Sequence, residues 1–215
     1  MKFKLLTLFF VLPFFAYAAN QSVSIKENID YKIVDSKVSL PHHNNKINVT
    51  EFFSYHCGHC FLLSQSLETW KNNHPNLDFN QMQVVWGNYF KTYAKINATI
   101  NIMNKPYLNN IIFKAVQEDS KNLDDEGVLE DVLKNNLSKA DYTQFMGIYG
   151  SFSISTKPNE YKKYSEAFDV KETPLVIVDN RYVILPAAPD RLMQVMDAVV
   201  AKASRERNLI LVPKH

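Results

Sequence analysis

The chain has 215 residues, of which 46% are apolar and 21% charged, with 24 Lys and Arg against 22 Asp and Glu. A formal net charge of +2 gives no electrostatic reason to expect a nucleic acid or an acidic membrane as a partner. The apolar fraction is enough for the packed core of one domain, with room for an insert.

The N-terminus has the layout of a secretory signal peptide. Lys2 and Lys4 frame the start of the apolar stretch Leu5–Ala16, and Ala16-Tyr17-Ala18 fits an A-x-A cleavage site. A membrane-spanning helix needs about 20 apolar residues, and polar Asn20 comes too early for one. We therefore expect residues 1–18 to be removed, which leaves a soluble, exported chain with balanced charge. Such a chain meets an oxidising environment, in which thiols tend to pair.

The first half of the exported chain predicts a strand, a helix and a second strand. Residues 19–45 are polar and predict a loose start with an edge strand. Ile47–Ser54 and Phe79–Trp86 are rich in β-branched and aromatic residues, as strands are. Between them, apolar residues recur on one helical face up to His74-Pro75; they are Cys60, Leu63, Leu67 and Trp70. Two strands joined by a helix within about forty residues indicate a parallel βαβ unit.

Residues 89–168 predict four or five helices. Acidic residues precede the apolar pattern of Val128–Leu137, where the helix dipole favours them. Ser138 and Asp141 resemble a capping box, with Asp in place of Glu, before Tyr142–Tyr149. A last helix is expected over Pro158–Phe168.

Strand signals return at the C-terminal end. Pro174–Leu185 contains two apolar runs around Asp179-Asn180-Arg181, which predicts a hairpin. Leu192, Val195, Val199 and Ala203 then predict an amphipathic helix. The apolar tail Leu209–Val212 fits no helix and could support a dimer.

The two cysteines of the chain, Cys57 and Cys60, lie two residues apart in "FFSYHCGHCF". A structural disulfide closing so short a loop would stabilise the fold by only about 2 kcal/mol. Tetrahedral zinc needs four ligands, and His56 and His59 cannot easily complete the site from neighbouring positions. A metal carrier, for copper rather than zinc, nevertheless stays open as an alternative.

A redox role for the pair has a physical mechanism. The change from strand to helix between Ser54 and Cys60 places Cys57 at a helix N-terminus, where free N–H groups and the dipole stabilise a thiolate. Cys60 lies one turn later and faces inward. Cys57 would be the nucleophile and Cys60 the resolving partner, while His59 could favour the Cys57 anion.

A carboxyl group on the preceding strand fits the same interpretation. The period of two places Glu51 on one face with Ile47, Val49 and Phe53, so it points at the core under the helix. A buried carboxylate is costly unless it is paired or protonated. We hypothesise that Glu51 accepts or relays the proton of Cys60; the alternative is an exposed glutamate at the strand end.

Taken in order, "EFFSYHCGHC", a helical segment and "TPLVIVDNRYV" resemble the DsbA-type thiol:disulfide oxidoreductases, over roughly residues 25–203. The resemblance implies an α/β chain with a thioredoxin fold and an inserted all-helical subdomain. The thioredoxin-like part would be 19–88 with 169–215, and the insert 89–168. It also implies a redox pair at Cys57 and Cys60, a tuning His59, a buried acid at Glu51, and a cis-proline loop at Thr173-Pro174 that binds an extended substrate.

The resemblance further implies a periplasmic protein disulfide oxidase without metal or cofactor. Its partners would be folding exported proteins and a DsbB-like membrane quinone reductase that reoxidises it. The chain departs from typical members in three respects: Gly58 replaces Pro, Thr173 replaces Val, and Asn80 and Gln81 stand where many members offer a Lys near the acid. The first two leave a disulfide isomerase or reductase open. Because 19–46 is too short for an isomerase-type dimerisation domain, we expect a monomeric oxidase.

Overall fold

The computed structural model describes residues 23–43 and 45–209. The predicted signal peptide at 1–18 lies outside the described residues, as does all of the apolar tail except Leu209, which packs against the core. Among the helices in this part of the chain, none is long and apolar enough to cross a membrane.

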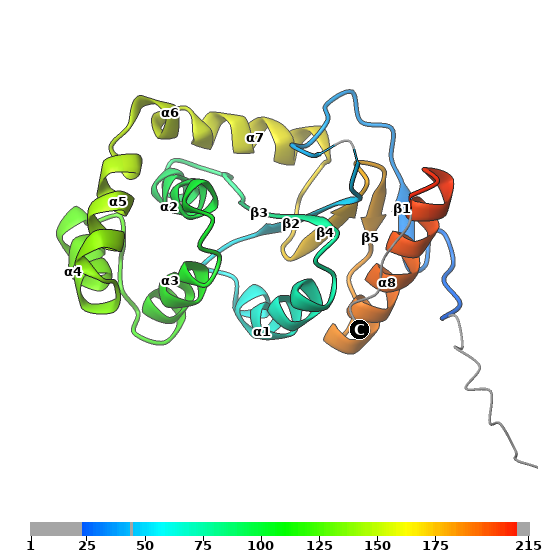
Figure 1. Ribbon diagram of the computed structural model, residues 1–215, viewed down its shortest axis with the longest axis horizontal. Helices are drawn as coiled ribbons and strands as arrows, with labels where there is room; N and C mark the ends of the chain where they lie inside the picture. The colour runs from blue at the N-terminus through cyan, green and yellow to red at the C-terminus, as the bar shows by residue number, and fades with distance from the viewer. Residues whose placement is uncertain (1–22, 44, 210–215) are drawn as a thin grey trace, which may run out of the picture.

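A five-stranded mixed sheet runs through the centre of the molecule in the order β1-β5-β4-β2-β3 (Figure 1). Only β2 and β3 pair in parallel, and the other neighbours are antiparallel. The strands are β1 Tyr31–Ile33, β2 Asn48–Phe53, β3 Asp78–Gln83, β4 Leu175–Val178 and β5 Tyr182–Ile184. The predicted edge strand, both strands of the βαβ unit and the hairpin are thus confirmed.

Helices cover both faces of the sheet. On one face, α1 (Gly58–Asn73) and α8 (Pro189–Glu206) pack on β2 and β4 through one apolar cluster that includes Leu67 and Val199. On the other face, α2 (Phe90–Met103) and α7 (Lys157–Ala167) pack on Phe52 and Ile177. Figure 1 shows the sheet between these two layers. The inward face predicted for α1, with Cys60, Leu63, Leu67 and Trp70, is buried.

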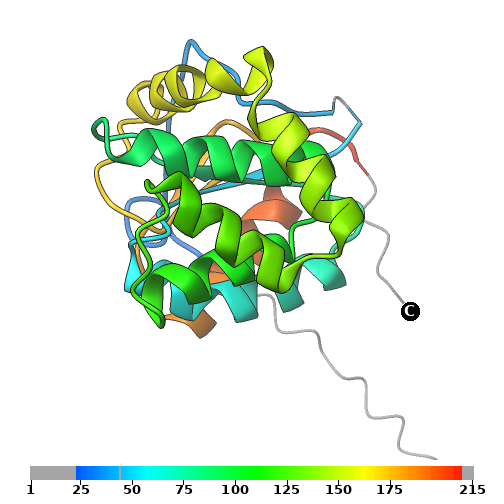
Figure 2. The same ribbon diagram turned by 90° about the vertical axis from the view of Figure 1, so that its left-hand side faces the viewer.

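Six helices follow β3 before the chain returns to the sheet (Figure 2). Besides α2 and α7 they are α3 Leu108–Gln117, α4 Glu126–Asn136, α5 Lys139–Tyr149 and the single turn α6 Phe152–Ser155. The count exceeds the predicted four or five because a separate short turn precedes α7, which has Pro158 in its first turn. The division of the chain at 89 and 168 stays a prediction, since α2 and α7 also pack on the sheet.

Side-chain caps explain where two of these helices begin. Asp125 accepts hydrogen bonds from the N–H groups of Gly127 and Val128 at the start of α4. Ser138 accepts from the N–H of Asp141 at the start of α5. Only this half of the predicted capping box forms, because the Asp141 carboxylate pairs with Lys105 instead.

Two side chains of α2 occupy the outer edge of β3. The Asn101 amide donates to the carbonyl of Gln81 at 2.9 Å, and Asn97 accepts from the N–H of Gln83 at 3.3 Å. The two asparagines are one helical turn apart, so both reach the same strand. Two of the backbone groups that β3 turns away from β2 are therefore satisfied by α2.

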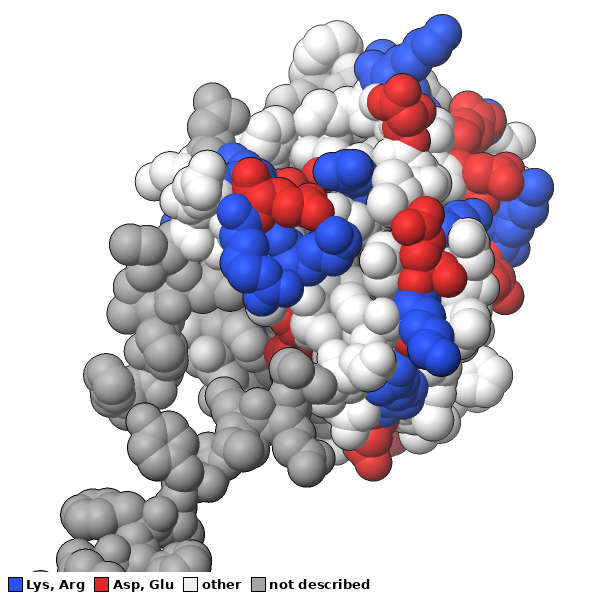
Figure 3. Space-filling view, turned by 90° about the vertical axis from the view of Figure 1, so that its right-hand side faces the viewer, with Lys and Arg blue, Asp and Glu red and all other residues white. Residues whose placement is uncertain are grey.

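Charges of both signs are interleaved on the face that carries α8 (Figure 3). Glu206 pairs there with Lys202 at 2.7 Å and with Arg181 at 3.4 Å. The basic side chains of this face are thus partly neutralised by the acids among them.

Candidate functional site

The site is built where β2 gives way to α1. After Phe53 a tight turn forms, in which the N–H of Cys57 donates to the carbonyl of Ser54 at 2.9 Å. Cys57 is the N-cap residue of α1, and its sulfur accepts from the N–H of Cys60 at 3.2 Å. A sulfur in this position replaces the oxygen of an ordinary cap and faces the unpaired amides of the first turn.

The two cysteines have very different surroundings. Both are free thiols; Cys57 is partly exposed, whereas Cys60 is only 1% exposed. Cys60 lies in an apolar cluster with Phe53, Tyr55 and Phe113, so it touches the core formed by the inserted helices. The helical spacing predicted this arrangement of one accessible and one enclosed sulfur.

These surroundings move the pKa values of the two thiols in opposite directions. A hydrogen bond from the Cys60 thiol lowers the pKa of Cys57 to about 5, with help from Thr173 and from the N–H groups of Cys60 and His59, and against the effect of burial. Burial raises the pKa of Cys60, and the hydrogen bond to Cys57 and the charge of Glu51 raise it further. At neutral pH the pair therefore holds one thiolate and one thiol.

The loop before β4 lies against the accessible sulfur. The Cys57 sulfur is 3.3 Å from the carbonyl oxygen of Thr173, and the peptide bond between Thr173 and Pro174 is cis. The cis bond agrees with the expectation from the family resemblance. The structure thus brings the predicted loop and Cys57 together.

An apolar pocket of about 570 Å³ opens beside this loop. It lies between the start of α1 and the segment from β5 to α8, and its lining includes Pro174, Leu62, His59 and Pro186. Leu62 is 72% exposed, which is unusual for a large apolar side chain. Sequence analysis missed Leu62 and Leu185–Ala187; the signal was an apolar residue on the outward face of α1.

Glu51 is buried under α1, at 1% exposure. Burial raises the pKa of its carboxyl group to about 7, although a hydrogen bond from Gln81 lowers it. The distance from Gln81 Nε2 to Glu51 Oε2 is 2.7 Å. The alternative of an exposed glutamate is wrong. All six residues of β2 are buried, however, so the alternation along this strand could not itself distinguish an inward from an outward face.

The two histidines beside the cysteines differ in their contacts. His59 is exposed, and no side-chain hydrogen bond to its ring is found in the part of the chain that the structure describes. The His56 ring instead packs on Tyr93 at 4.4 Å between centroids, with Nε2 2.7 Å from the Tyr89 hydroxyl. Burial lowers the pKa of His56, which favours its neutral form.

Within residues 23–43 and 45–209, no group of three or more His, Cys, Asp or Glu side chains is arranged to hold a metal ion. The groups that the structure brings together at the site are the two sulfurs, the buried carboxyl group and the adjacent loop.

Comparisons with known proteins agree on one family. No family model matches the chain. The thiol:disulfide interchange protein DsbA of Azotobacter vinelandii is 26% identical over 181 residues, which cover 80% of this chain and 84% of that protein. DsbA of Burkholderia cepacia is 25% identical over 183 residues, covering 83% and 85%.

Solved structures show the same fold. Reduced DsbA1 from Neisseria meningitidis matches with a TM-score of 0.77 and 24% identity over 86% of this chain and 97% of that one. DsbA of Pseudomonas aeruginosa matches with a TM-score of 0.75 and 22% identity over 83% and 94%.

Proposed function

Because the chain is a thiol:disulfide oxidoreductase of the DsbA family, with a thioredoxin fold that carries a helical insert, we propose that it donates a Cys57–Cys60 disulfide to folding exported proteins. The observation that carries the proposal is the contrast between the two sulfurs. One is partly exposed with a pKa of about 5, and the other is buried with a raised pKa.

The contrast sets the order of bond changes. A client thiolate attacks the Cys57 sulfur of the oxidised pair, forms a mixed disulfide there and expels the Cys60 sulfur, which takes up a proton. The second client thiolate attacks the client sulfur of the mixed disulfide and releases Cys57 as a thiolate. Two electrons pass from the client to the enzyme, both client protons go to solvent, and the proton that Cys60 takes up comes from an acid within the enzyme.

The same contrast favours oxidation of the client. Interactions that stabilise the Cys57 thiolate are present only in the reduced enzyme, since the sulfur carries no charge in a disulfide. Stabilising the reduced form raises the reduction potential of the pair and makes its disulfide a stronger oxidant. A thiolate with a low pKa is also a good leaving group in the second step.

We propose that Glu51 exchanges a proton with Cys60. A group that transfers protons works best when its pKa is close to the ambient pH, and that of Glu51 is about 7. As an acid, Glu51 can protonate the departing Cys60 sulfur when the disulfide opens. As a carboxylate, it can take that proton back when the pair is reoxidised.

Client chains would bind across the loop and pocket beside Cys57. The backbone of Thr173 lies at the sulfur, where it can pair with an extended client segment, as in β-augmentation. The pocket next to it, with Leu62 and Pro174, suits apolar side chains of an unfolded client. We place His59, which lines this pocket, at the point where the client cysteine approaches.

The cellular setting belongs to the same proposal. The N-terminal sequence supports export to the periplasm through a cleaved signal peptide at 1–18. A DsbB-like quinone-linked membrane protein would then remove two electrons from the reduced pair, and the enzyme would work as a monomer.

An isomerase or reductase kept in the reduced state is the second candidate. It is favoured by Gly58-His59 between the cysteines and by Thr173 before the cis-proline, since these residues occur in isomerase-type relatives.

Trapping in cells tests both candidates. Cys60→Ala leaves mixed disulfides at Cys57 unresolved, and Cys57→Ala is the matched control. The chains are produced in a bacterial strain without its own DsbA. If the protein is an oxidase, Cys60→Ala is expected to form mixed disulfides with newly exported proteins. Thiol alkylation is expected to find the Cys57–Cys60 pair of the unsubstituted chain oxidised. Complexes confined to clients that already contain disulfides, with a reduced pair, would establish the isomerase. Finding no complexes beyond those of the Cys57→Ala control would refute both.

A further inference from the structure

The buried carboxyl group of Glu51 has a polar neighbour at one of the positions where the chain departs from typical family members. Gln81 lies directly beside Glu51 in the register of β2 and β3, and its Nε2 donates to Glu51 Oε2 at 2.7 Å. Among the described residues, this is the one side chain that donates a hydrogen bond to the Glu51 carboxyl group. The donor is a neutral amide, so it holds the carboxyl group without adding a charge.

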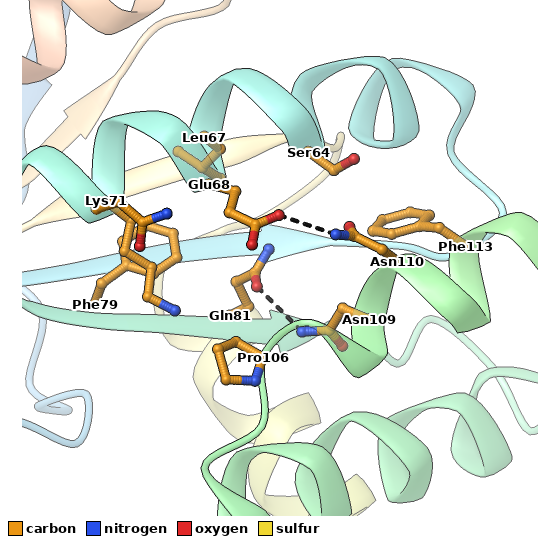
Figure 4. A pocket seen from close by; sticks show the side chains of 11 residues that line it. Ser64, Leu67, Glu68, Lys71, Phe79, Gln81, Pro106, Asn109, Asn110 and Phe113 are labelled. Carbon is orange, nitrogen blue, oxygen red and sulfur yellow. Dashed lines mark hydrogen bonds between the residues drawn. The ribbon is translucent and has the colours of Figure 1, made fainter. Parts of the chain in front are cut away.

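A second amide, from the inserted helices, fixes the orientation of Gln81. Asn109 of α3 donates through Nδ2 to Gln81 Oε1 at 3.2 Å, as Figure 4 shows. Because the Gln81 oxygen is engaged in this bond, its NH₂ group must face Glu51. Asn109 is itself 3% exposed, and its oxygen accepts from the Tyr55 hydroxyl and from Asn97. Tyr55 thus donates to Asn109, Asn109 donates to Gln81, and Gln81 donates to Glu51.

The groups that face Glu51 make this donor important. At the start of α1 they are the sulfurs of Cys57 and Cys60: the charge of Cys57 raises the pKa of Glu51, and the charge of Glu51 raises the pKa of Cys60. From the turn after β2 comes the Tyr55 hydroxyl, which burial keeps protonated by raising its pKa. From β4, the paired residue is the apolar Val176. Burial and the charge of Cys57 oppose a charge on Glu51, and Gln81 is the neighbour that favours it.

A small pocket brings solvent close to the far side of Gln81. It has a volume of about 60 Å³ and lies between α1, α3 and β3 (Figure 4). Gln81 and Asn109 line it together with the side chains of Glu68 and Lys71 on α1. Glu68 accepts a hydrogen bond from Asn110 at 2.9 Å beside it. A space of this size holds water, so Gln81 separates the buried acid from a solvated cavity.

Resting on the proposed function, we propose that Gln81 is the residue that positions Glu51 for proton exchange with Cys60, and that Asn109 holds Gln81 in place. Gln81 keeps its own protons throughout. When Cys60 leaves the disulfide and takes the proton of Glu51, the new carboxylate is stabilised by the Gln81 amide. When Cys60 is reoxidised, the carboxylate held by that amide receives the proton.

Substitution of the donor tests the proposal. Gln81→Met keeps the length of the side chain and removes its donor. Asn80→Met is the matched control, since Asn80 is adjacent on β3 but lies beside Thr50 in the register, and its Nδ2 has no hydrogen-bond partner among the described residues. The reduced chain is labelled with ¹³C at glutamate carboxyl groups, and Glu51→Gln identifies the Glu51 signal.

Gln81→Met is expected to move the titration midpoint of Glu51 upward by about one pH unit, the equivalent of a charged hydrogen bond of about 1.5 kcal/mol. The pH profile of the single-turnover reduction of the Cys57–Cys60 disulfide by a dithiol peptide is expected to move with it. Asn80→Met is expected to leave both midpoints unchanged. Asn109→Leu keeps Gln81 but removes the hydrogen bond to its Oε1. This variant is expected to move both midpoints in the same direction as Gln81→Met, by a smaller amount.

An unchanged Glu51 midpoint in Gln81→Met would overturn the proposal, even if the variant exchanged disulfides more slowly. If Gln81→Met fails to fold, an unchanged midpoint in Asn109→Leu overturns it instead. A chain without any thiol exchange would refute the proposed function, whereas the carboxyl titration would still report whether Gln81 stabilises the Glu51 carboxylate. The two failures are thus distinguishable.

Discussion

Glu51 predicts an unusual pH dependence of stability. Its pKa is raised from 4.5 to about 7 in the folded chain, chiefly by burial. Between these values the folded chain keeps the proton that the unfolded chain has lost, so the free energy of unfolding falls as the pH rises. A difference of about 2.5 units corresponds to about 3 kcal/mol, which is fully lost above pH 7.

Glu51→Gln removes this penalty and keeps an oxygen that can accept from Gln81. In urea unfolding of the reduced chains, we expect the variant to be more stable than the unsubstituted chain by about 3 kcal/mol at pH 8. At pH 4 the advantage from titration should vanish, because both states then carry the proton. Other titrating groups are the same in both chains, so their effects cancel in the difference between the two free energies of unfolding.

Glu68→Gln is the matched control, since Glu68 is an exposed glutamate on the adjacent helix. Its effect should stay within about 0.5 kcal/mol at both pH values, as for most surface substitutions. The measured quantity is the difference in unfolding free energy between Glu51→Gln and the unsubstituted chain. If this difference were the same at pH 8 as at pH 4, the pKa of Glu51 would be the same in the folded and the unfolded chain. The proton-transfer role would then lose its basis.

Three further outcomes are expected. In the reduced chain, the thiolate absorbance near 240 nm should appear with a midpoint near pH 5 and be missing in Cys57→Ser; because this pKa lies below its ordinary value, the reduced chain gains stability as pH rises from 5 to 9, and a midpoint above 8 would contradict the mechanism. Thr173→Val should move that midpoint upward, since a hydrogen bond from the Thr173 side chain lowers the pKa of Cys57. An unchanged absorbance titration would show that this side chain does not affect the pKa of the thiol. Asp125→Ala should lower the free energy of unfolding by about 1 kcal/mol, because it removes the N-cap of α4; the exposed Asp131→Ala on the same helix is the control, and equal effects in denaturant titrations would argue against the cap.

The sequence predicted the arrangement of the two cysteines well because that arrangement is local. Helical spacing alone places Cys57 at the start of α1 and Cys60 one turn later on the buried face. The contact between Cys57 and Thr173 joins residues 116 positions apart, and no periodicity reports such a distance. It was expected only through the resemblance to a family. The exposure of Leu62 likewise became meaningful only when the pocket beside Pro174 was visible.

The surroundings of Glu51 show a different limit. An alternating pattern reports burial only where one face of a strand meets solvent, and β2 is covered on both faces. Gln81 stood out only as a departure from the family, and nothing in the sequence indicated its contact with Glu51, because an amide on a strand can equally face water, the backbone or a carboxyl group. In the helical region, the helix predicted over Pro158–Phe168 is α7, and the single turn α6 before it is too short for an apolar period to show.

The asparagines that α2 places along the rim of β3 have a consequence for a protein that handles unfolded chains. Free strand edges recruit other extended segments and so promote aggregation. Asn97 and Asn101 already satisfy the outward N–H of Gln83 and the outward carbonyl of Gln81. A client polypeptide could therefore not pair with these two groups, and under the proposed function it would dock beside Cys57 instead and leave once its own disulfide has formed.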